Sequence, residues 1–199
     1  NLHEWVQLKD QARVCGIDDS PFEFGNRNAK ADVIGAIVRI PSYLEGVLRF
    51  EVAVDGDDAT SAIMRALSSS RFLDQIKAVM IDGVSLAGFN VIDITGLSED
   101  LDMPVITVTR NRPDMDSIRA ALSKYFEDWE NRFATVSSLP VIEMRTEHNP
   151  VFISFAGSTK EEATELVRKT TVRGAIPEPI RMAHIIASGI VKGESKGKA

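Results

Sequence analysis

Two carboxylates in this sequence stand where short apolar runs stop. Asp18 follows the run at 13–17, and Asp82 follows the run at 78–81. A strand that ends on a carboxylate can present it as a metal ligand at the rim of a sheet, and hard oxygen ligands suit Mg²⁺ or Mn²⁺. The two residues therefore predict a divalent-metal site if their strands are neighbours. The structural alternative is that each Asp opens a solvated turn, where this residue type is favoured.

A histidine and two arginines are the next candidates. His184 and Arg181 are three residues apart in the apolar segment that begins at Pro177, so on a helix they share one face. A buried histidine and arginine need polar partners, which the two carboxylates would supply. Arg110 follows the apolar run at 105–109, so it also stands at the end of an expected strand. The alternatives are a hydrogen-bonded core histidine and a surface arginine.

Apolar periodicity and turn signals divide the chain into strands and helices. Strands are expected at 13–17, 32–40, 46–54, 78–81, 105–109, 141–145 and 151–155; helices are expected from 59, from Pro113 to about Trp129, after a capping box at Ser158 and Glu161, and from Pro177 to about Val191. The segment 84–101 is ambiguous between a short helix and a loop. The last helix is apolar nearly all round, which predicts that it is buried.

The order of these elements predicts the fold class. Three consecutive strands with short connections indicate an antiparallel meander, and the strands that follow alternate with helical segments. This is the order of an α/β, ribonuclease H-like fold, in which three antiparallel strands and then two parallel strands form one mixed sheet flanked by helices. Strands joined by a helical crossover are parallel and near neighbours. Asp18 and Asp82 are therefore expected at the same edge of the sheet.

Length, composition and charge narrow the class of protein. With 199 residues, 44% of them hydrophobic and 26% charged, the chain is expected to form one domain over residues 1–199. No apolar run is long enough to span a membrane, and the single cysteine, Cys15, fits a reducing compartment, so a cytoplasmic protein is expected. The net charge of -6 argues against broad electrostatic binding to nucleic acid, although a bound metal ion neutralises its carboxylate ligands.

Several motifs resemble endonuclease V, and more closely an uncharacterised, largely archaeal family related to it and known as a domain of unknown function. The resemblance covers most of the chain in the same order. Its motifs are Gly16-Ile17-Asp18, the stretch 42–51, Ile81-Asp82-Gly83, the strand ending on Arg110, the strand at 151–155 and, most specifically, the Pro177-Glu178-Pro179 helix with His184.

The resemblance implies a ribonuclease H-like, endonuclease V-like domain that hydrolyses phosphodiester bonds near modified bases in DNA or RNA, with Mg²⁺ or Mn²⁺ as cofactor. Asp18 and Asp82 are implied to ligate the ion. His184 is implied to assist the water or the leaving group, and Arg110 to hold the phosphate.

The resemblance also implies substrate contacts. The stretch 42–51 resembles a wedge loop, which makes Tyr43 and Gly46 candidate contacts, although Tyr43 is equally a candidate packing residue. Arg181 is the third candidate contact, because it shares a helix face with His184.

The family that this chain resembles has a third acidic residue, a catalytic glutamate on the third strand, and this sequence has no acidic residue at the matching position. In the ungapped match it falls on Val52, one residue after Glu51, and a shift of one residue turns a side chain to the other face of a strand. Glu51 is the candidate third metal ligand if a bulge re-aims it, and Asp55 or Asp57 are the alternatives. The departure keeps a second interpretation open, in which the chain is a catalytically inactive module that binds nucleic acid or a protein partner. The same features would suit a homo-oligomer.

Overall fold

Seven strands form the main sheet of this protein, and six helices pack around it in the described part of the chain. The structure is a computed structural model that describes residues 11–26 and 28–195. The strands of the main sheet are β1 (Arg13–Asp19), β2 (Lys30–Arg39), β3 (Tyr43–Ala53), β4 (Ile76–Asp82), β7 (Val105–Thr109), β8 (Ile142–Met144) and β9 (Val151–Ala156). A separate small hairpin is formed by β5 (Ser85–Leu86) and β6 (Asn90–Val91). The helices are α1 (Ala59–Ser68), α2 (Ile94–Leu101), α3 (Met115–Tyr125), α4 (Trp129–Ser137), α5 (Lys160–Thr170) and α6 (Glu178–Lys192), and a 3-10 turn, Leu73–Gln75, precedes β4.

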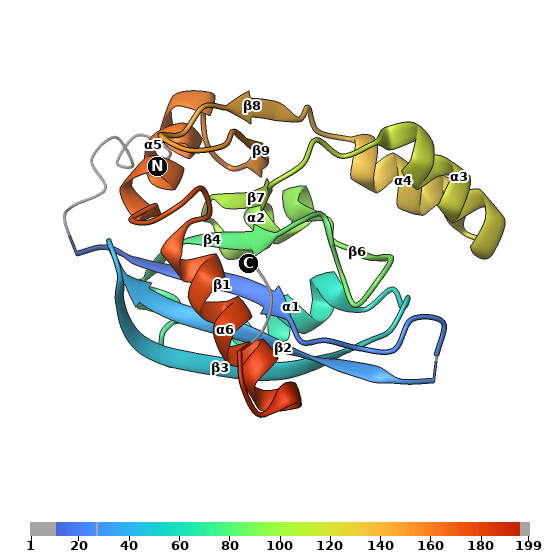
Figure 1. Cartoon of the computed structure of the whole chain (residues 1–199), viewed down its shortest axis with the longest axis horizontal. Helices are drawn as coiled ribbons and strands as arrows, with labels where there is room; N and C mark the ends of the chain where they lie inside the picture. Colours follow the sequence, from blue (N-terminus) through green and yellow to red (C-terminus); the bar gives the residue numbers. More distant parts are fainter. Residues whose placement is uncertain (1–10, 27, 196–199) are drawn as a thin grey trace.

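The strand order confirms the predicted fold. The sheet runs β3-β2-β1-β4-β7-β9-β8 (Figure 1). β1, β2 and β3 pair antiparallel, while β4 lies parallel to β1, and β7 lies parallel to β4. β1 and β4 are therefore neighbours whose carboxyl ends point to the same edge. The prediction of one domain over residues 1–199 extends at both ends beyond the described residues.

Helices cover both faces of the sheet, and the alternation of side chains along each strand builds a core on each side. α1 and α2 pack on one face, over a cluster that includes Ile17, Val33, Val52, Ile63, Ile81 and Leu97. α5 and α6 pack on the other face, over Met80, Ile106, Val108, Leu166 and Ile180 in one cluster and Ile34, Ala36, Ala183 and Ala187 in the next. Because Ile17 points toward α1, its neighbour Asp18 points toward α6.

Three details of the helices differ from the sequence prediction. The expected helix from Pro113 to Trp129 is two helices, because Phe126 leaves the helical conformation and packs edge-on against Phe89, with ring centroids 5.7 Å apart. The capping box is formed one residue later than predicted, by Thr159 and Glu162.

The third difference concerns α6, which is buried along one face as far as Ala187 and Ser188 and is not buried all round. Ile190 and Val191 near its end are each 49% exposed. In Figure 1 the end of this helix reaches past the strands that it covers.

Among the described residues, no helix has the length and apolarity needed to cross a bilayer.

Candidate metal centre

The close packing of α6 on β1 sets the geometry of the site. A Cβ atom added at Gly16 would lie 2.0 Å from the carbonyl carbon of Pro179, so only glycine admits the start of α6 at this position. His184 follows Pro179 by about one and a half helical turns, and Asp18 follows Gly16 along β1. The glycine-isoleucine-aspartate and proline-glutamate-proline motifs are thus the two sides of one contact. A glycine inside a buried strand was the sequence signal for this close approach.

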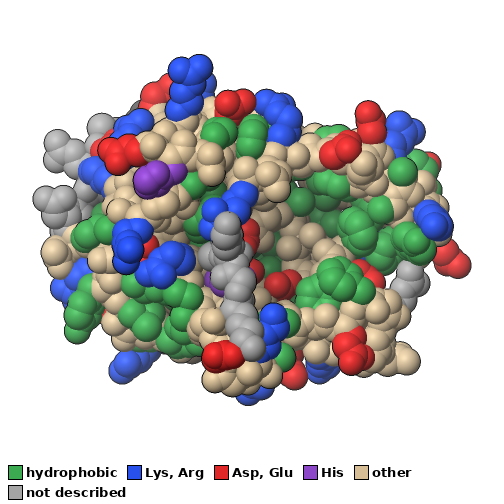
Figure 2. Space-filling model, viewed as in Figure 1, with side chains coloured by type: hydrophobic (Ala, Val, Ile, Leu, Met, Phe, Trp, Pro, Cys, Tyr) green, Lys and Arg blue, Asp and Glu red, His purple; other side chains and the backbone are tan. Residues whose placement is uncertain are grey.

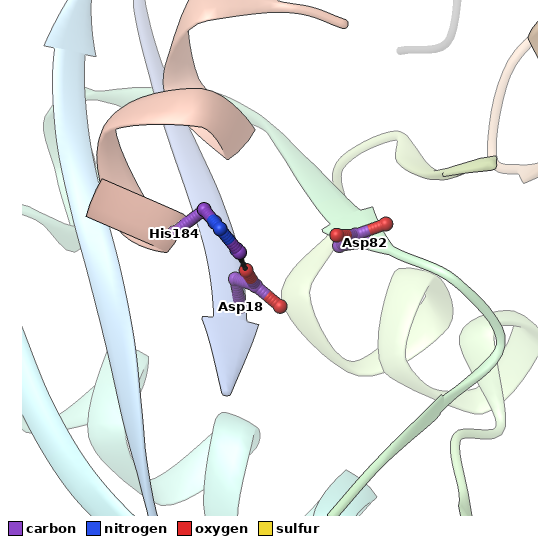
Figure 3. A group of neighbouring side chains, drawn as sticks. All are labelled: Asp18, Asp82 and His184. Atoms are coloured by element: carbon purple, nitrogen blue, oxygen red, sulfur yellow. Dashed lines mark hydrogen bonds and ion pairs between the residues drawn. The ribbon is translucent and has the colours of Figure 1, made fainter. Parts of the chain in front are cut away.

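Asp18 and His184 form a hydrogen-bonded pair across this contact. His184 Nδ1 lies 2.8 Å from Asp18 Oδ2, and Figure 3 shows the ring pointing at the carboxylate. Asp18 is 6% exposed, and its Oδ1 accepts the backbone N–H of Asp19. The second ring nitrogen, His184 Nε2, is buried and has no hydrogen-bond partner among the described residues. A buried polar atom without a partner marks a position for a ligand or a water molecule.

Asp82 supplies a second carboxylate from the neighbouring strand. Ile17 pairs with Ile81 in parallel register, so the next residues, Asp18 and Asp82, lie side by side on the α6 face. One ligand atom from each of Asp18, Asp82 and His184 lies within 4.8 Å of the others (Figure 3). The structure therefore brings together three of the residues that the sequence singled out.

The electrostatics of the group favour a cation. The pKa of Asp82 is raised to about 7, chiefly by burial and then by the adjacent charge of Asp18, while His184 and Arg110 oppose this rise. The hydrogen bond to Asp18 raises the pKa of His184. Two carboxylates crowded at a buried rim resist ionisation together, and a divalent cation between them would relieve this repulsion.

Asp19 faces the other way and has a different role. Its carboxylate accepts the backbone N–H of Ala87, which stands in the left-handed region with φ of 46°. Burial raises the pKa of Asp19 to about 6. Asp19 therefore holds the turn between β5 and β6, a contact that the sequence did not predict.

The two arginines lie in different environments. Arg110 is exposed at the end of β7, and its charge is close enough to lower the pKa of Asp82 against the effect of burial. Arg181 is engaged elsewhere, because its Nε and Nη2 donate to the carboxylate of Glu178 at 2.9 and 2.7 Å. Glu178 is only 3% exposed, so Arg181 neutralises a buried charge at the start of α6. The spacing of three residues was the signal for this pair.

Glu51, the expected third ligand, lies outside the group. The register places it on the same face as Asp18, because Asp18 opposes Ile34, and Ile34 opposes Arg49, two residues before Glu51. It is nevertheless two strands away from Asp18. Its side chain is 54% exposed and lies 3.8 Å from Lys30 Nζ.

Asp55 and Asp57 are also outside the group. Asp55 Oδ1 accepts the backbone N–H of Phe89 at 3.0 Å, and Asp57 is exposed. In the described part of the chain, the metal-binding group therefore consists of two carboxylates and a histidine.

Tyr43 and Gly46 lie near the opposite end of the sheet. Tyr43 is aligned through β2 with Arg13, which begins β1, whereas Asp18 is near the end of that strand. At about 3.3 Å per residue the separation along the strand is roughly 16 Å. Tyr43 is 68% exposed. A Cβ atom at Gly46 would lie 2.4 Å from the ring of Phe72, so this glycine makes room for an aromatic side chain.

Comparison with known proteins places this chain in a family. Residues 10–191 match the endonuclease dU family. The chain belongs to this family. A UPF0215 protein of Methanothermobacter thermautotrophicus is 43% identical over 199 residues, which cover 99% of this chain and 96% of the relative. These matches identify an uncharacterised archaeal family related to endonuclease V.

Solved structures agree with this assignment. A crystal structure of a protein of unknown function from Archaeoglobus fulgidus superposes with a TM-score of 0.81 at 34% identity, over 90% of this chain and 98% of that one. Endonuclease V of Ciona intestinalis, solved with a DNA that contains an inosine, superposes with a TM-score of 0.62 at 15% identity, over 94% of this chain and 89% of that one. The second likeness shows that this endonuclease dU family member has the endonuclease V fold.

The donor set of this family member fits a hard divalent cation. Asp18 and Asp82 offer carboxylate oxygens, which Mg²⁺ and Mn²⁺ prefer, and His184 lies beside them with its Nδ1 engaged by Asp18. The unpartnered Nε2 of His184 and the raised pKa of Asp82 both indicate that the group is complete only with a further ligand.

Proposed function

We propose that this protein is a metal-dependent endonuclease that hydrolyses a phosphodiester bond beside a deaminated base. The observation that carries the proposal is the convergence of Asp18, Asp82 and His184 within 4.8 Å at the rim of an endonuclease V-like sheet. The family description names deoxyuridine, and the Ciona intestinalis neighbour was crystallised with inosine-containing DNA. DNA that contains deoxyuridine is therefore the first candidate substrate, and RNA is the second class to test.

The residues of the rim divide the chemistry among them. Asp18 and Asp82 would hold a Mg²⁺ or Mn²⁺ ion, which would supply a Lewis acid for the phosphate and lower the pKa of a bound water molecule. Asp18 fixes the ring of His184 so that Nδ1 donates and Nε2 is the nitrogen that exchanges protons. Nε2 accepts a proton from the attacking water or returns one to the leaving oxygen. Arg110, exposed beside Asp82, binds a phosphate oxygen.

The surface around the rim supports a polymeric substrate. Figure 2 shows a hollow between the sheet and the α3–α4 hairpin on the face that carries α6, bordered by acidic and hydrophobic side chains. Acidic groups at the bottom of a hollow bind a polyanion only when a cation neutralises them. The proposal therefore predicts that the metal ion is needed for substrate binding as well as for cleavage.

The test compares labelled strands that carry one deoxyuridine, one deoxyinosine or no modified base, in DNA and in RNA, with Mg²⁺, Mn²⁺ or a chelator. Cleavage next to the modified base that requires the metal ion supports the proposal. Asp82→Asn is expected to lower the rate about 1000-fold or more, because it removes a metal ligand. Asp100→Asn is the matched control, because Asp100 is exposed on α2, which covers the other face of the sheet.

A second candidate function, binding without cleavage, follows from the small number of carboxylates near His184. Only two carboxylates reach the histidine within the described residues, which suits a module that binds a modified strand without cutting it. Binding of the modified strand with no metal-dependent cleavage would favour this function. Neither cleavage nor binding of any of the strands would exclude both.

A further inference from the structure

β3 forms an uncovered edge of the main sheet. It is the outermost strand on its side, and β2 is its one strand neighbour among the described residues. At its end, the backbone N–H of Ala53 donates to Asp58 and its carbonyl oxygen accepts from Asn90. Figure 1 shows no strand beyond it, although the end of α6 reaches past this margin in the view. It is 11 residues long and contains neither proline nor lysine, the residue types that commonly protect an edge from pairing. A register shift places a bulge at Glu45, but the segment 46–53 pairs with β2 without interruption.

The regular segment of β3 carries opposite charges in a self-complementary order. Arg49 and Glu51 are two residues apart, so both point to the α6 face. Their side chains are 60% and 54% exposed, and their partners are Asp32 at 2.8 Å and Lys30 at 3.8 Å, both on β2. Each charge therefore leaves its outer side open to a further partner.

A second copy of β3 fits this edge in one antiparallel register. A two-fold axis through Phe50 places Arg49 opposite Glu51 of the partner subunit and Glu51 opposite Arg49 of the partner subunit. An axis through Arg49 would place two arginines opposite each other, and an axis through Leu48 would place Glu51 opposite Glu45 of the partner subunit. The charges thus select the register centred on Phe50.

The other face of the strand agrees with the same register. Leu48 and Phe50 are partly buried against the core that lies under α1 and α2, and Val52 is fully buried in it. Pairing about Phe50 brings the two Phe50 rings together and sets Leu48 opposite Val52 of the partner subunit. Val47 is 44% exposed on the α6 face, and strand pairing ends there, because the backbone groups of the opposing Ala53 are bound by Asp58 and Asn90. Apolar side chains therefore flank the charged pairs and extend the core across the boundary.

We propose that this protein forms a symmetric dimer by antiparallel pairing of β3 with β3 of a second copy. The two-fold axis is perpendicular to the sheet, so α6 of both subunits lies on the same face of one continuous sheet. Asp18 is level with Arg49, one residue from the axis. The two rims therefore lie on the same face of the sheet, one on each side of the axis, about five strand spacings apart. The assembly goes beyond the proposed cleavage and does not depend on it.

Complementary charge reversals test the register directly. Sedimentation equilibrium of the wild type is expected to give a mass of twice 21.9 kDa. Arg49→Glu places a carboxylate opposite Glu51 of the partner subunit, and Glu51→Arg places a guanidinium opposite Arg49 of the partner subunit. Each variant alone is expected to weaken the dimer about tenfold or more, because both symmetric pairs become repulsive. An equimolar mixture of the two variants is expected to restore the dimer, because every cross-subunit pair is again of opposite sign.

The controls separate association from folding. Glu147→Arg makes the same change of charge in the β8–β9 connection, at the other edge of the sheet, and is expected to leave the dimer constant within about twofold. Far-ultraviolet circular dichroism of each variant reports whether the subunit is folded. A monomeric wild type would overturn the proposal. Folded single variants that dimerise as the wild type does, or a mixture that stays monomeric, would overturn the register.

Discussion

β1 carries a charged cluster at each end, and the two clusters behave in opposite ways. Near its start, the Glu45 carboxylate accepts hydrogen bonds from Arg13 and Arg39. The hydrogen bond from Arg13 holds the pKa of Glu45 below its ordinary value. Near its end, the pKa of Asp82 is raised to about 7, chiefly by burial and then by the charge of the neighbouring Asp18.

The difference separates a cluster whose charges are balanced within the chain from one whose charges are not. At the start of β1 the chain itself supplies both signs of charge, so the cluster is complete without a ligand. At the end of β1 two carboxylates meet one histidine, and a buried ring nitrogen has no partner among the described residues. Unbalanced buried groups destabilise a fold unless a ligand completes them, and they concentrate where proteins bind ions and substrates.

The largest expected effect is on metal affinity. Removal of a carboxylate should weaken metal binding at the end of β1 but not at its start. Asp82→Asn is expected to weaken Mn²⁺ binding about 100-fold or more, because an amide oxygen replaces an anionic ligand. Glu45→Gln makes the same kind of change at the other end and is expected to leave Mn²⁺ affinity within about twofold. Isothermal titration calorimetry measures both. Equal affinities for the two variants would remove the distinction between the clusters.

The contact between β1 and α6 should leave no room for an added methyl group at Gly16, so adding one should lower the stability of the fold. Gly16→Ala is expected to destabilise the fold by about 3 kcal/mol, because its Cβ would collide with the backbone of Pro179. Gly35→Ala on β2 is the matched control, since its Cβ would lie 3.3 Å from Cys15 Sγ and Leu48 Cβ, where side chains can adjust. Its expected cost is about 1 kcal/mol. Urea denaturation gives both values, and equal costs would contradict the close approach of α6 to β1.

Metal binding at the end of β1 should depend on pH. Asp82, with its pKa near 7, must lose its proton to bind a cation, so protons and metal ions compete. Affinity for Mn²⁺ is expected to rise by up to about tenfold per pH unit as pH increases toward 7, and to level off above it. Titration calorimetry from about pH 5.5 to about pH 8 measures this slope. A flat profile would show that Asp82 is not among the ligands.

Without metal, the two clusters should contribute to stability with opposite sign. A carboxylate whose pKa is raised by folding contributes stability below its ordinary pKa of 3.8, and this contribution is lost as pH rises toward about 7. Asp82→Asn is therefore expected to stabilise the metal-free protein at about pH 8 by about 1 kcal/mol. Glu45→Gln is expected to lower the melting temperature at the same pH, because the pKa of Glu45 is lowered by its arginines. Calorimetric melting curves in a chelator decide the sign for each variant.

The sequence predicted the elements that carry strong periodicity, and it failed where tertiary contacts override local pattern. The seven main strands and the parallel placement of β1 and β4 followed from apolar runs and crossover rules. The apolar spacing from Met115 to Trp129 continues across the break between α3 and α4, so periodicity could not reveal it. The break depends on Phe126 packing against Phe89, which is distant in the sequence.

The candidate site shows the same limit. Strand ends indicated Asp18 and Asp82, because the C-terminal ends of parallel neighbours share an edge of the sheet. The sequence predicted that Glu51 faces away from the site unless a bulge re-aims it, whereas the register places it on the same face as Asp18. Glu51 is excluded by its distance of two strands, which depends on the order of the strands. Nor could it show that Arg181 is occupied by Glu178, because several helical neighbours compete for one guanidinium.

The hydrogen bond between Asp18 and His184 joins residues that are 166 positions apart in the chain. A ribosome therefore completes the carboxylate end of the rim long before it makes the helix that orients the histidine. A nascent or truncated chain that lacks α6 has both carboxylates but not the histidine that pairs with Asp18. Undocking of α6 in the finished protein would disassemble the rim in the same way, so the integrity of the last helix and the chemistry of the first strand are inseparable.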